Sequence, residues 1–200
     1  MRKFAFVAVA GLLSASAFAD QGDILARFRV IDVAPQTGAD GYLATLNPSV
    51  KSDTVPEVDF TYMITNNVGA ELILGTSRHD AHLDALGADL GKISVLPPTL
   101  TLQYHFTPQA TFRPYVGAGI NYTYFYDNDL HVGASKVTVN RDSWGPALQV
   151  GADYAITKDW FVNVDVKKLY IRTDAQLNGA PIGTLKLDPW VYGIGIGTKF

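Results

Sequence analysis

Histidine is the residue whose spacing in this 200-residue chain comes nearest to a metal-binding or reactive pattern. His79 and His82 are separated by two residues, a spacing that could present two imidazole rings to one metal ion. No third ligand is evident beside them, so exposed loop histidines are the simpler interpretation. His105 has no local Ser–His–acid motif, and we interpret it as a histidine hydrogen-bonded to its neighbours. The sequence therefore predicts no catalytic residue, no cofactor and no metal site.

Opposite charges form the second chemical pattern. Arg27 and Arg29 occupy alternate positions of one segment, and Glu57 and Asp59 occupy alternate positions of another. Alternate side chains of a β-strand share one face. If the two segments are neighbouring strands of a closed sheet, these four side chains meet in its interior, where ion pairs could plug the lumen.

The N-terminal residues predict export. Arg2 and Lys3 precede an apolar stretch over residues 4–13, and a small-x-small cleavage site ends at Ala19. We interpret residues 1–19 as a secretory signal peptide and residues 20–200 as the mature chain. The alternative, a membrane-anchoring helix, is disfavoured because the apolar stretch is too short to cross a bilayer.

Composition excludes several classes of protein. The formal net charge of −3 argues against nucleic acid as a partner. The chain has no cysteine, which excludes a disulfide framework, a thiolate nucleophile and a cysteine metal site. Its 48% hydrophobic content could bury a soluble core, so composition does not separate a periplasmic domain from a membrane barrel.

The alternation of residue types over 188–200 predicts a membrane-crossing strand. One face carries Trp190, Tyr192, Ile194, Ile196, Thr198 and Phe200. The opposite face is mostly glycine. About ten residues with aromatic rings at both ends fit one crossing by a tilted strand. A terminal aromatic such as Phe200 is typical of outer-membrane barrels, whose assembly machinery reads it, so we predict that Phe200 is the assembly signal.

Similar alternation predicts eight strands in all. They cover approximately residues 23–33, 57–64, 68–76, 99–106, 115–126, 144–156, 160–167 and 188–200. Short turns near residues 66, 108 and 158 alternate with long segments over 35–55, 77–97, 127–143 and 173–184. A short helix or an irregular loop could occupy residues 83–90. Short turns at one end and long loops at the other are typical of small outer-membrane barrels.

The predicted fold is therefore all-β, an eight-stranded antiparallel transmembrane β-barrel integral to a Gram-negative outer membrane, with its long loops facing the cell exterior. A soluble lipocalin-like barrel is the competing interpretation, because alternation alone does not tell the inner face from the outer. Tyrosine and tryptophan near strand ends, the terminal Phe200, and glycines sharing a face with charges favour the membrane barrel.

Several phrases, in order along nearly the whole mature chain, resemble the outer membrane protein W family. They are FTYMITNNVGAEL at 60–72, LPPTL at 96–100, QYHF at 103–106, FRPYVGAGINY at 112–122, DSWG at 142–145 and DPWVYG at 188–193. The resemblance implies an eight-stranded outer-membrane barrel whose apolar channel passes small, largely hydrophobic molecules that leave sideways through the wall. The chain departs from the family at Glu57 and Asp59, where apolar or neutral residues are usual. This departure leaves open how apolar the lower lumen is.

Pro97 and Pro98 stand where a strand should begin. Proline has no N–H for the ladder, so two in succession could open the wall, or they could simply end a loop. The side exit that the resemblance implies favours the opening.

Large side chains at other positions are further candidates for the channel lining. Trp144 could constrict the mouth, although its phase favours an interface anchor on the lipid face. The remaining candidates, on the face shared with polar residues and glycine, are Met63, Tyr115, Phe125 and Phe161. They could line the channel or simply fill a narrow lumen.

The function predicted from these observations is a diffusion channel for small hydrophobic or weakly polar solutes, without enzymatic activity. The expected partners are membrane lipids and lipopolysaccharide, the solutes themselves and the barrel assembly machinery. Two alternatives remain: a structural or adhesive barrel with a plugged lumen, and an outer-membrane enzyme that modifies lipid, which would need clustered His, Ser and acidic groups at one rim.

Overall fold

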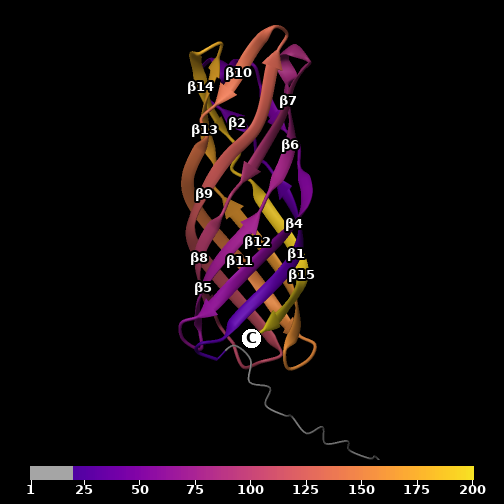
Figure 1. Cartoon of the computed structure of the whole chain (residues 1–200), viewed down its shortest axis with the longest axis vertical. Coiled ribbons are helices and arrows are strands. Elements are labelled where there is room, and N and C mark those ends of the chain that lie inside the picture. The colour runs from indigo at the N-terminus through magenta and orange to yellow at the C-terminus, as the bar shows by residue number, and fades with distance from the viewer. Residues whose placement is uncertain (1–19) are drawn as a thin grey trace, which may run out of the picture.

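The structure, a computed structural model, describes residues 20–200. The predicted signal peptide, residues 1–19, lies outside the described residues. The chain forms a tall barrel whose long strands are tilted relative to the barrel axis (Figure 1).

Eight strands close the lower half of the barrel. They are β1 (Ile24–Ala34), β4 (Asp53–Met63), β5 (Val68–Gly75), β8 (Thr99–His105), β9 (Phe112–Val132), β11 (Asp142–Ala155), β12 (Trp160–Leu169) and β15 (Trp190–Lys199). Each is antiparallel to its neighbours, and β1 pairs with both β4 and β15, which closes the ring. Closure leaves no open sheet edge for lipid to face. The predicted eight-stranded antiparallel barrel is confirmed.

The upper part of the barrel corrects the prediction of long loops. Most of residues 77–97, 127–143 and 173–184 continue the wall as strands (Figure 1). These strands are β6 (Ser77–Leu83), β7 (Ala88–Leu96), β10 (Ser135–Val139), β13 (Arg172–Leu177) and β14 (Ala180–Lys186). Strand β9 alone has 21 residues, whereas a tilted crossing of a bilayer needs about 9–11. The wall therefore continues well beyond the membrane.

The segment between β1 and β4 supplies the remaining pieces of the upper wall. It contains β2 (Gly38–Ala39), the helix α1 (Gly41–Thr45) and β3 (Pro48–Val50). Strand β2 pairs with β14, and β3 pairs with β6. The possible helix over 83–90 is reduced to one 3₁₀ turn, η1 (Asp84–Leu86), which Gly87 ends with a positive φ of 58°. No helix in residues 20–200 is long and apolar enough to cross a membrane.

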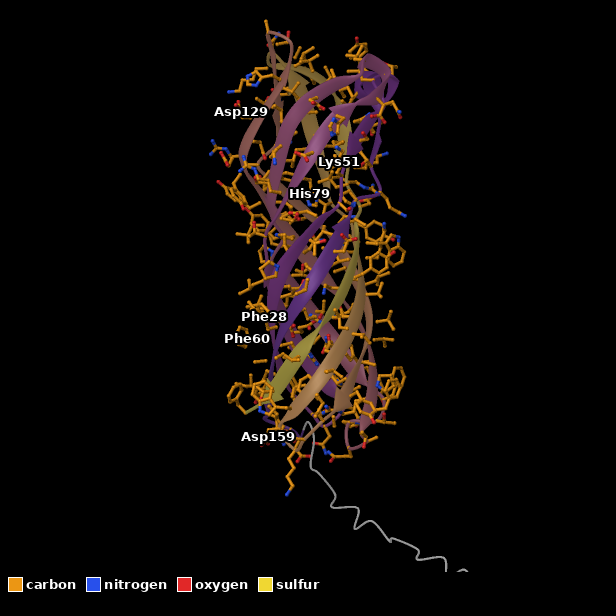
Figure 2. All side chains as sticks on the ribbon, turned by 90° about the vertical axis from the view of Figure 1, so that its right-hand side faces the viewer. Phe28, Lys51, Phe60, His79, Asp129 and Asp159 are labelled. Carbon is orange, nitrogen blue, oxygen red and sulfur yellow. The ribbon has the colours of Figure 1, made fainter. Side chains whose placement is uncertain are left out.

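The two faces of the wall have opposite chemistry. Phe28 and Phe60 project from the outside with about half of their surface exposed, 52% and 49% (Figure 2). Their sequence neighbours Arg27 and Asp59 point inward and are 2% and 0% exposed. A soluble barrel would have the reverse arrangement, and so broad an apolar outer surface is stable only in lipid. The lipocalin-like alternative is therefore wrong.

The upper limit of the apolar outer band can be located on the strand pair β5 and β6. Leu72 and Leu74 face outward in β5, whereas the next large outward side chain, Arg78, is charged and exposed. Residues beyond Arg78 on this strand pair therefore lie outside the membrane-spanning part. Figure 2 places Asp129 toward this end of the molecule and Asp159 at the other.

We expect cysteine labelling to report this orientation, since the natural chain has no cysteine. Ala134→Cys lies in the turn between β9 and β10, and Lys158→Cys lies in the turn between β11 and β12. A membrane-impermeant maleimide should modify the first variant in intact cells, and the second only after the outer membrane is permeabilised. The opposite pattern of labelling would show that the barrel is inserted the other way round.

Candidate functional site in the barrel interior

The lower interior contains the predicted charge cluster. Register places Arg27 opposite Asp59 and Arg29 opposite Glu57 on β1 and β4. Arg27 Nη1 lies 3.0 Å from Asp59 Oδ1, and Arg29 Nε lies 2.9 Å from Glu57 Oε1. Arg29 Nη2 also lies 2.5 Å from Asp59 Oδ2. None of these four side chains is more than 5% exposed, so the ion pairs are inside the barrel.

Three more strands extend the cluster across the lumen. Arg27 Nη2 lies 3.0 Å from Asp153 Oδ2 on β11, and Arg29 Nη2 lies 3.3 Å from Glu71 Oε1 on β5. On β12, Lys167 Nζ lies 2.6 Å from Asp165 Oδ1 and 2.9 Å from Glu57 Oε1. We call Arg27, Arg29, Glu57, Asp59, Glu71, Asp153, Asp165 and Lys167 the charged floor.

Several members of the charged floor were not identified from the sequence. Alternation did place Asp153, Asp165 and Lys167 on the inner faces of their strands. It contains no information on which charges meet across the barrel, because Arg27 and Asp153 are 126 residues apart. Such a layer is stable only because each guanidinium has several hydrogen-bonded partners that compensate its desolvation.

Neutral side chains complete the layer. Gln149 Nε2 donates to Asp165 at 2.8 Å, and Thr101 Oγ1 donates to Glu71 at 3.0 Å. The Tyr115 hydroxyl donates to Asp165 at 3.0 Å and accepts from Asn163 at the same distance. With these groups, seven of the eight strands contribute a hydrogen-bonding side chain, and β15 does not.

Strand β15 instead has glycine on its inner face, because there is no room there for a side chain. A Cβ at Gly195 would lie 2.1 Å from the carbonyl oxygen of Phe28 and 2.7 Å from the Cα of Arg29. A Cβ at Gly197 would lie 2.4 Å from the ring of Phe161. No side chain fits at either position without displacing the contents of the lumen.

Three of the predicted channel residues belong to this filled lower half. Met63 and Phe161 pack with Leu25 in a small apolar cluster at the end of the barrel with the short turns, and each is fully buried. The Phe161 ring also lies under the guanidinium of Arg27, 5.5 Å from its centroid. Tyr115 is hydrogen-bonded to Asp165 of the charged floor. These positions fit the interpretation that the side chains fill the lumen.

Trp144 does not line the lumen. Its side chain faces outward, is 67% exposed and packs on the ring of Tyr122, with 4.8 Å between centroids. Its inclusion among the channel candidates was wrong, and its position is that of an interface anchor. Trp144 lies an even number of residues from Leu148 and Val150, which also face outward, and this alternation indicates the outer face.

Above the charged floor the interior becomes apolar. The buried cluster here extends from Ile31 and Val33 through Phe125, the fourth predicted channel residue, to Leu43 and Leu83 at the outer end. It contains a cavity of about 30 Å³ near the floor and one of about 170 Å³ at the mouth. A cavity of about 150 Å³ holds one benzene molecule, whereas about 30 Å³ suits a single water molecule. The apolar interior is therefore wide at the mouth and narrow near the charged floor.

The lower of these two cavities lies between the charged floor and the upper barrel. Glu57 and Lys167 form its base. Most of its wall is apolar, with Ile31, Val33, Val95, Leu169 and Ile171 among the lining residues. We call it the lower cavity.

Strand β6 continues the line of β5, and β7 leads into β8. The pairing between these two stretches of the wall is interrupted beside the lower cavity. Ladder partners run up to Ile73 and Thr99 and resume at Ser77 and Val95, in the same register. Residues 74–76 and 96–98, which include Pro97 and Pro98, have no ladder partners across this seam. Pro97 lines the lower cavity together with Gly75 and Thr76. The prolines thus do more than end a loop, because they stand at an interruption in the wall of the cavity.

On its other side, the proline segment remains attached to β9. The backbone N–H of Tyr122 donates to the carbonyl oxygen of Pro98 at 3.0 Å. Thr76 partly replaces the missing backbone bonds, since its Oγ1 donates to the carbonyl oxygen of Val95 at 3.1 Å. The interruption at the prolines is therefore bounded by intact pairing on the β9 side and has side-chain contacts across it, while the ladder between β4 and β5 also ends at this level, at Glu57 and Gly75.

The interpretation of His79 and His82 as exposed loop residues is wrong, because both lie in β6. His79 points inward and is 2% exposed. His82 is paired with Asp89 on the neighbouring strand, and no group of metal ligands occurs in the described part of the chain. His105 is buried and its Nε2 lies 3.1 Å from Gln103 Oε1, as expected of a histidine hydrogen-bonded to its neighbours.

A closed barrel with a lipid-facing outer surface and a polar lower lumen defines the class of small outer-membrane β-barrel proteins. The model of the OmpW family matches residues 20–200, and the chain belongs to this family. Outer membrane protein W of Escherichia coli K12 is 43% identical over 208 residues, which covers 98% of this chain and 97% of the relative. The chain is thus an integral protein of the outer membrane.

Two further proteins are similar to it. The crystal structure of the outer membrane protein OprG from Pseudomonas aeruginosa superimposes with a TM-score of 0.78 at 31% identity, covering 92% of this chain and 98% of OprG. The dibenzothiophene metabolism operon protein PahQ of Pseudomonas aeruginosa is 36% identical over 149 residues, or 71% of this chain and 69% of PahQ.

We predict that Asp59→Ala destabilises the barrel by about 3–5 kcal/mol, because it removes the buried carboxylate that lies nearest to both Arg27 and Arg29 and leaves Glu71 as their only shared carboxylate. Equilibrium unfolding in urea, with the protein in lipid vesicles, would measure this loss. Asp159→Ala, in an exposed periplasmic turn, is the matched control and should unfold like the natural protein. Equal stability of the two variants would mean that the ion pairs of Asp59 contribute nothing to the fold.

Proposed function

We propose that this protein is a diffusion channel that carries small hydrophobic or weakly polar molecules across the outer membrane and releases them sideways into it. In this mechanism a solute binds first in the mouth cavity and then moves down the apolar upper barrel. It leaves through the interrupted seam at Pro97 and Pro98. The observation that carries the proposal is that the interruption lies where the apolar interior meets the charged floor.

The charged floor makes the sideways path more favourable than the axial one. An apolar solute that continued along the axis would have to separate buried ion pairs, and breaking even one costs several kcal/mol. A solute that leaves through the wall enters lipid, where its apolar surface stays out of water, worth about 25 cal/mol per Å². The floor therefore directs an apolar solute toward the seam.

The lower cavity has to widen for this transport. Its volume of about 30 Å³ is far below the roughly 150 Å³ that a benzene-sized molecule fills. Thr76 and Pro97 line it at the seam, where no ladder hydrogen bonds need to break for the strands to separate. We infer that the structure represents a closed state, which opens by local separation of residues 74–76 from residues 96–98.

The relatives agree with an apolar solute class. PahQ is named for an operon of dibenzothiophene metabolism, and dibenzothiophene is a polycyclic aromatic compound. The mouth cavity of this chain is lined by leucines, valines and Ile182, which suits such a molecule or a smaller one. We propose that the protein has no enzymatic activity of its own, and that membrane lipids and lipopolysaccharide surround its outer face.

A plugged structural or adhesive barrel is the second candidate. The specific observation in its favour is the charged floor, which closes the axial path and rigidifies the barrel. Such a protein would show no uptake at all, which separates it from the channel by direct measurement.

The C-terminal residue supports a proposal about assembly. Phe200 is 75% exposed, and its backbone N–H donates to the carbonyl oxygen of Ile24 at 2.9 Å. The last residue is thus paired with the first strand while its ring stays accessible. We propose that the barrel assembly machinery recognises this ring.

We expect the double substitution Pro97→Thr and Pro98→Thr to reduce uptake of hydrophobic solutes. Threonine supplies the missing N–H groups, so residues 96–98 can pair with residues 74–76 across the seam and close the wall. The measurement is the initial rate at which intact cells with a sealed outer membrane take up N-phenylnaphthylamine, a fluorescent apolar probe. Cells without the protein give the background rate.

Pro56→Thr provides a matched control, because Pro56 lies on the lipid face of β4 and away from this seam. It should keep the natural uptake rate. Unchanged uptake by a correctly folded Pro97, Pro98 double variant would show that solutes do not leave through this seam.

A further inference from the structure

One pair of polar side chains in the lower cavity is not explained by the charged floor or by the wall. Glu57 and Lys167 are paired with each other at its base, 2.9 Å apart. The hydroxyl groups of Thr76 and Thr99 donate to backbone carbonyl groups, at 3.1 Å and 3.0 Å. Two other polar lining residues, Ser77 and His79, remain, and they are adjacent inward-facing positions of β6.

The hydrogen bonds of His79 determine which of the two side chains, Ser77 or His79, donates to the other. Its Nδ1 lies 2.8 Å from the carbonyl oxygen of Lys51, which can only accept, so Nδ1 carries the proton. Nε2 is then an acceptor, and the Ser77 hydroxyl donates to it at 2.7 Å. Burial lowers the pKa of His79 below its usual value of 6.5, which keeps the ring neutral at pH 7.

This direction determines what Ser77 can offer to a solute. A serine hydroxyl has one donor hydrogen and two acceptor lone pairs. Because the hydrogen is used by His79, the oxygen offers only acceptor capacity to the lower cavity. A carbonyl or ether group therefore finds no donor in Ser77, whereas a hydroxyl or N–H group finds an acceptor.

We propose that Ser77, oriented by His79, is a binding site for the hydroxyl or N–H group of an otherwise apolar solute. The inference rests on the proposed channel and names its preferred substrates as alcohols, phenols and related hydrogen-bond donors. Ser77 directly follows Thr76, so the site lies at the interrupted seam. A solute held there has its polar end on Ser77 and its apolar body beside the opening into lipid.

The size of the effect is modest but measurable. One neutral hydrogen bond made in a site that excludes water changes affinity by about fivefold. The preference among solutes of equal shape is therefore a sharper test than affinity alone. Three cyclic probes of nearly equal size differ in the required way: cyclohexanol donates and accepts, cyclohexanone only accepts, and cyclohexane does neither.

The experiment measures the Kd of each probe for the full-length mature protein in lipid nanodiscs, from the amide chemical shifts of Gly75 and Val95, which line the cavity. The natural protein should bind cyclohexanol about fivefold more tightly than cyclohexanone. Ser77→Ala should abolish this preference, and Ser77→Thr, which keeps the hydroxyl group, should restore it.

Two further variants separate this site from a general effect on the fold. Ser94→Ala is the matched control, since Ser94 is equally buried on the neighbouring strand but does not line the cavity. It should keep the preference for the alcohol. His79→Leu frees the Ser77 hydrogen to point into the cavity, so the preference should move toward cyclohexanone. A merely structural role of His79 would leave the ratio of the two affinities unchanged.

The outcomes distinguish this inference from the proposed function. Equal binding of all three probes by the natural protein would overturn the Ser77 site and leave the apolar pathway standing. An alcohol preference that persists in Ser77→Ala would assign recognition to another group, with Glu57 at the base of the cavity as the nearest carboxylate. Failure of even cyclohexane to shift these amides would contradict the apolar pathway itself, and the site with it.

Discussion

The ion pairs of Arg27 and Arg29 are the interaction on which the rest of the barrel depends. Two guanidinium groups inside a narrow lumen must be satisfied from all sides, and four other strands, β4, β5, β11 and β12, supply the carboxylate and amide groups that do so. Glycine on β15 is a consequence, because a Cβ at Gly195 would collide with the backbone of Arg29. The layer fixes the radius of the lower barrel and closes its axis.

Closure of the axis gives meaning to the weak seam at the prolines. In lipid, an unsatisfied backbone group costs several kcal/mol, so a membrane barrel pairs its strands as completely as it can. Here the pairing is missing over 74–76 and 96–98, at the outer limit of the lipid-facing band. Prolines make this tolerable because they have no N–H to leave unsatisfied. The weak seam and the closed floor lie at adjacent levels, which is the arrangement a sideways exit requires.

The strand pattern could be predicted from the sequence because alternation is a local property. Eight runs with period two predict the strands, the division of each strand into two unlike faces, and the meeting of Arg27 with Asp59 on adjacent strands. The contact of Arg27 with Asp153 could not be predicted, since it depends on the number of strands and their stagger across a closed ring. The seam at the prolines was only one of two interpretations until the ladder partners on either side were known.

The extended upper wall was missed for a different reason. The long segments between the predicted strands are rich in glycine, asparagine, aspartate and charged residues, a composition typical of loops. In β6 the inward face carries Ser77, His79, Ala81 and Leu83, a mixture whose polar members hide the alternation. The same mixture led to the wrong assignment of His79 as an exposed histidine. It is buried because a strand, and not a loop, carries it into the interior.

The height of the barrel follows from the chemistry of its upper interior. Apolar side chains such as Leu43, Phe125 and Leu130 stay out of water only if a continuous wall surrounds them above the membrane. Backbone hydrogen bonds between β6, β7, β9 and β10 provide that wall, and α1 packs against β14 near the mouth. An apolar solute that enters this interior is shielded from water before it reaches the level of the lipid. The extension thereby encloses one continuous cluster of apolar side chains from the mouth to the level of the seam, with the charged floor as its lower boundary.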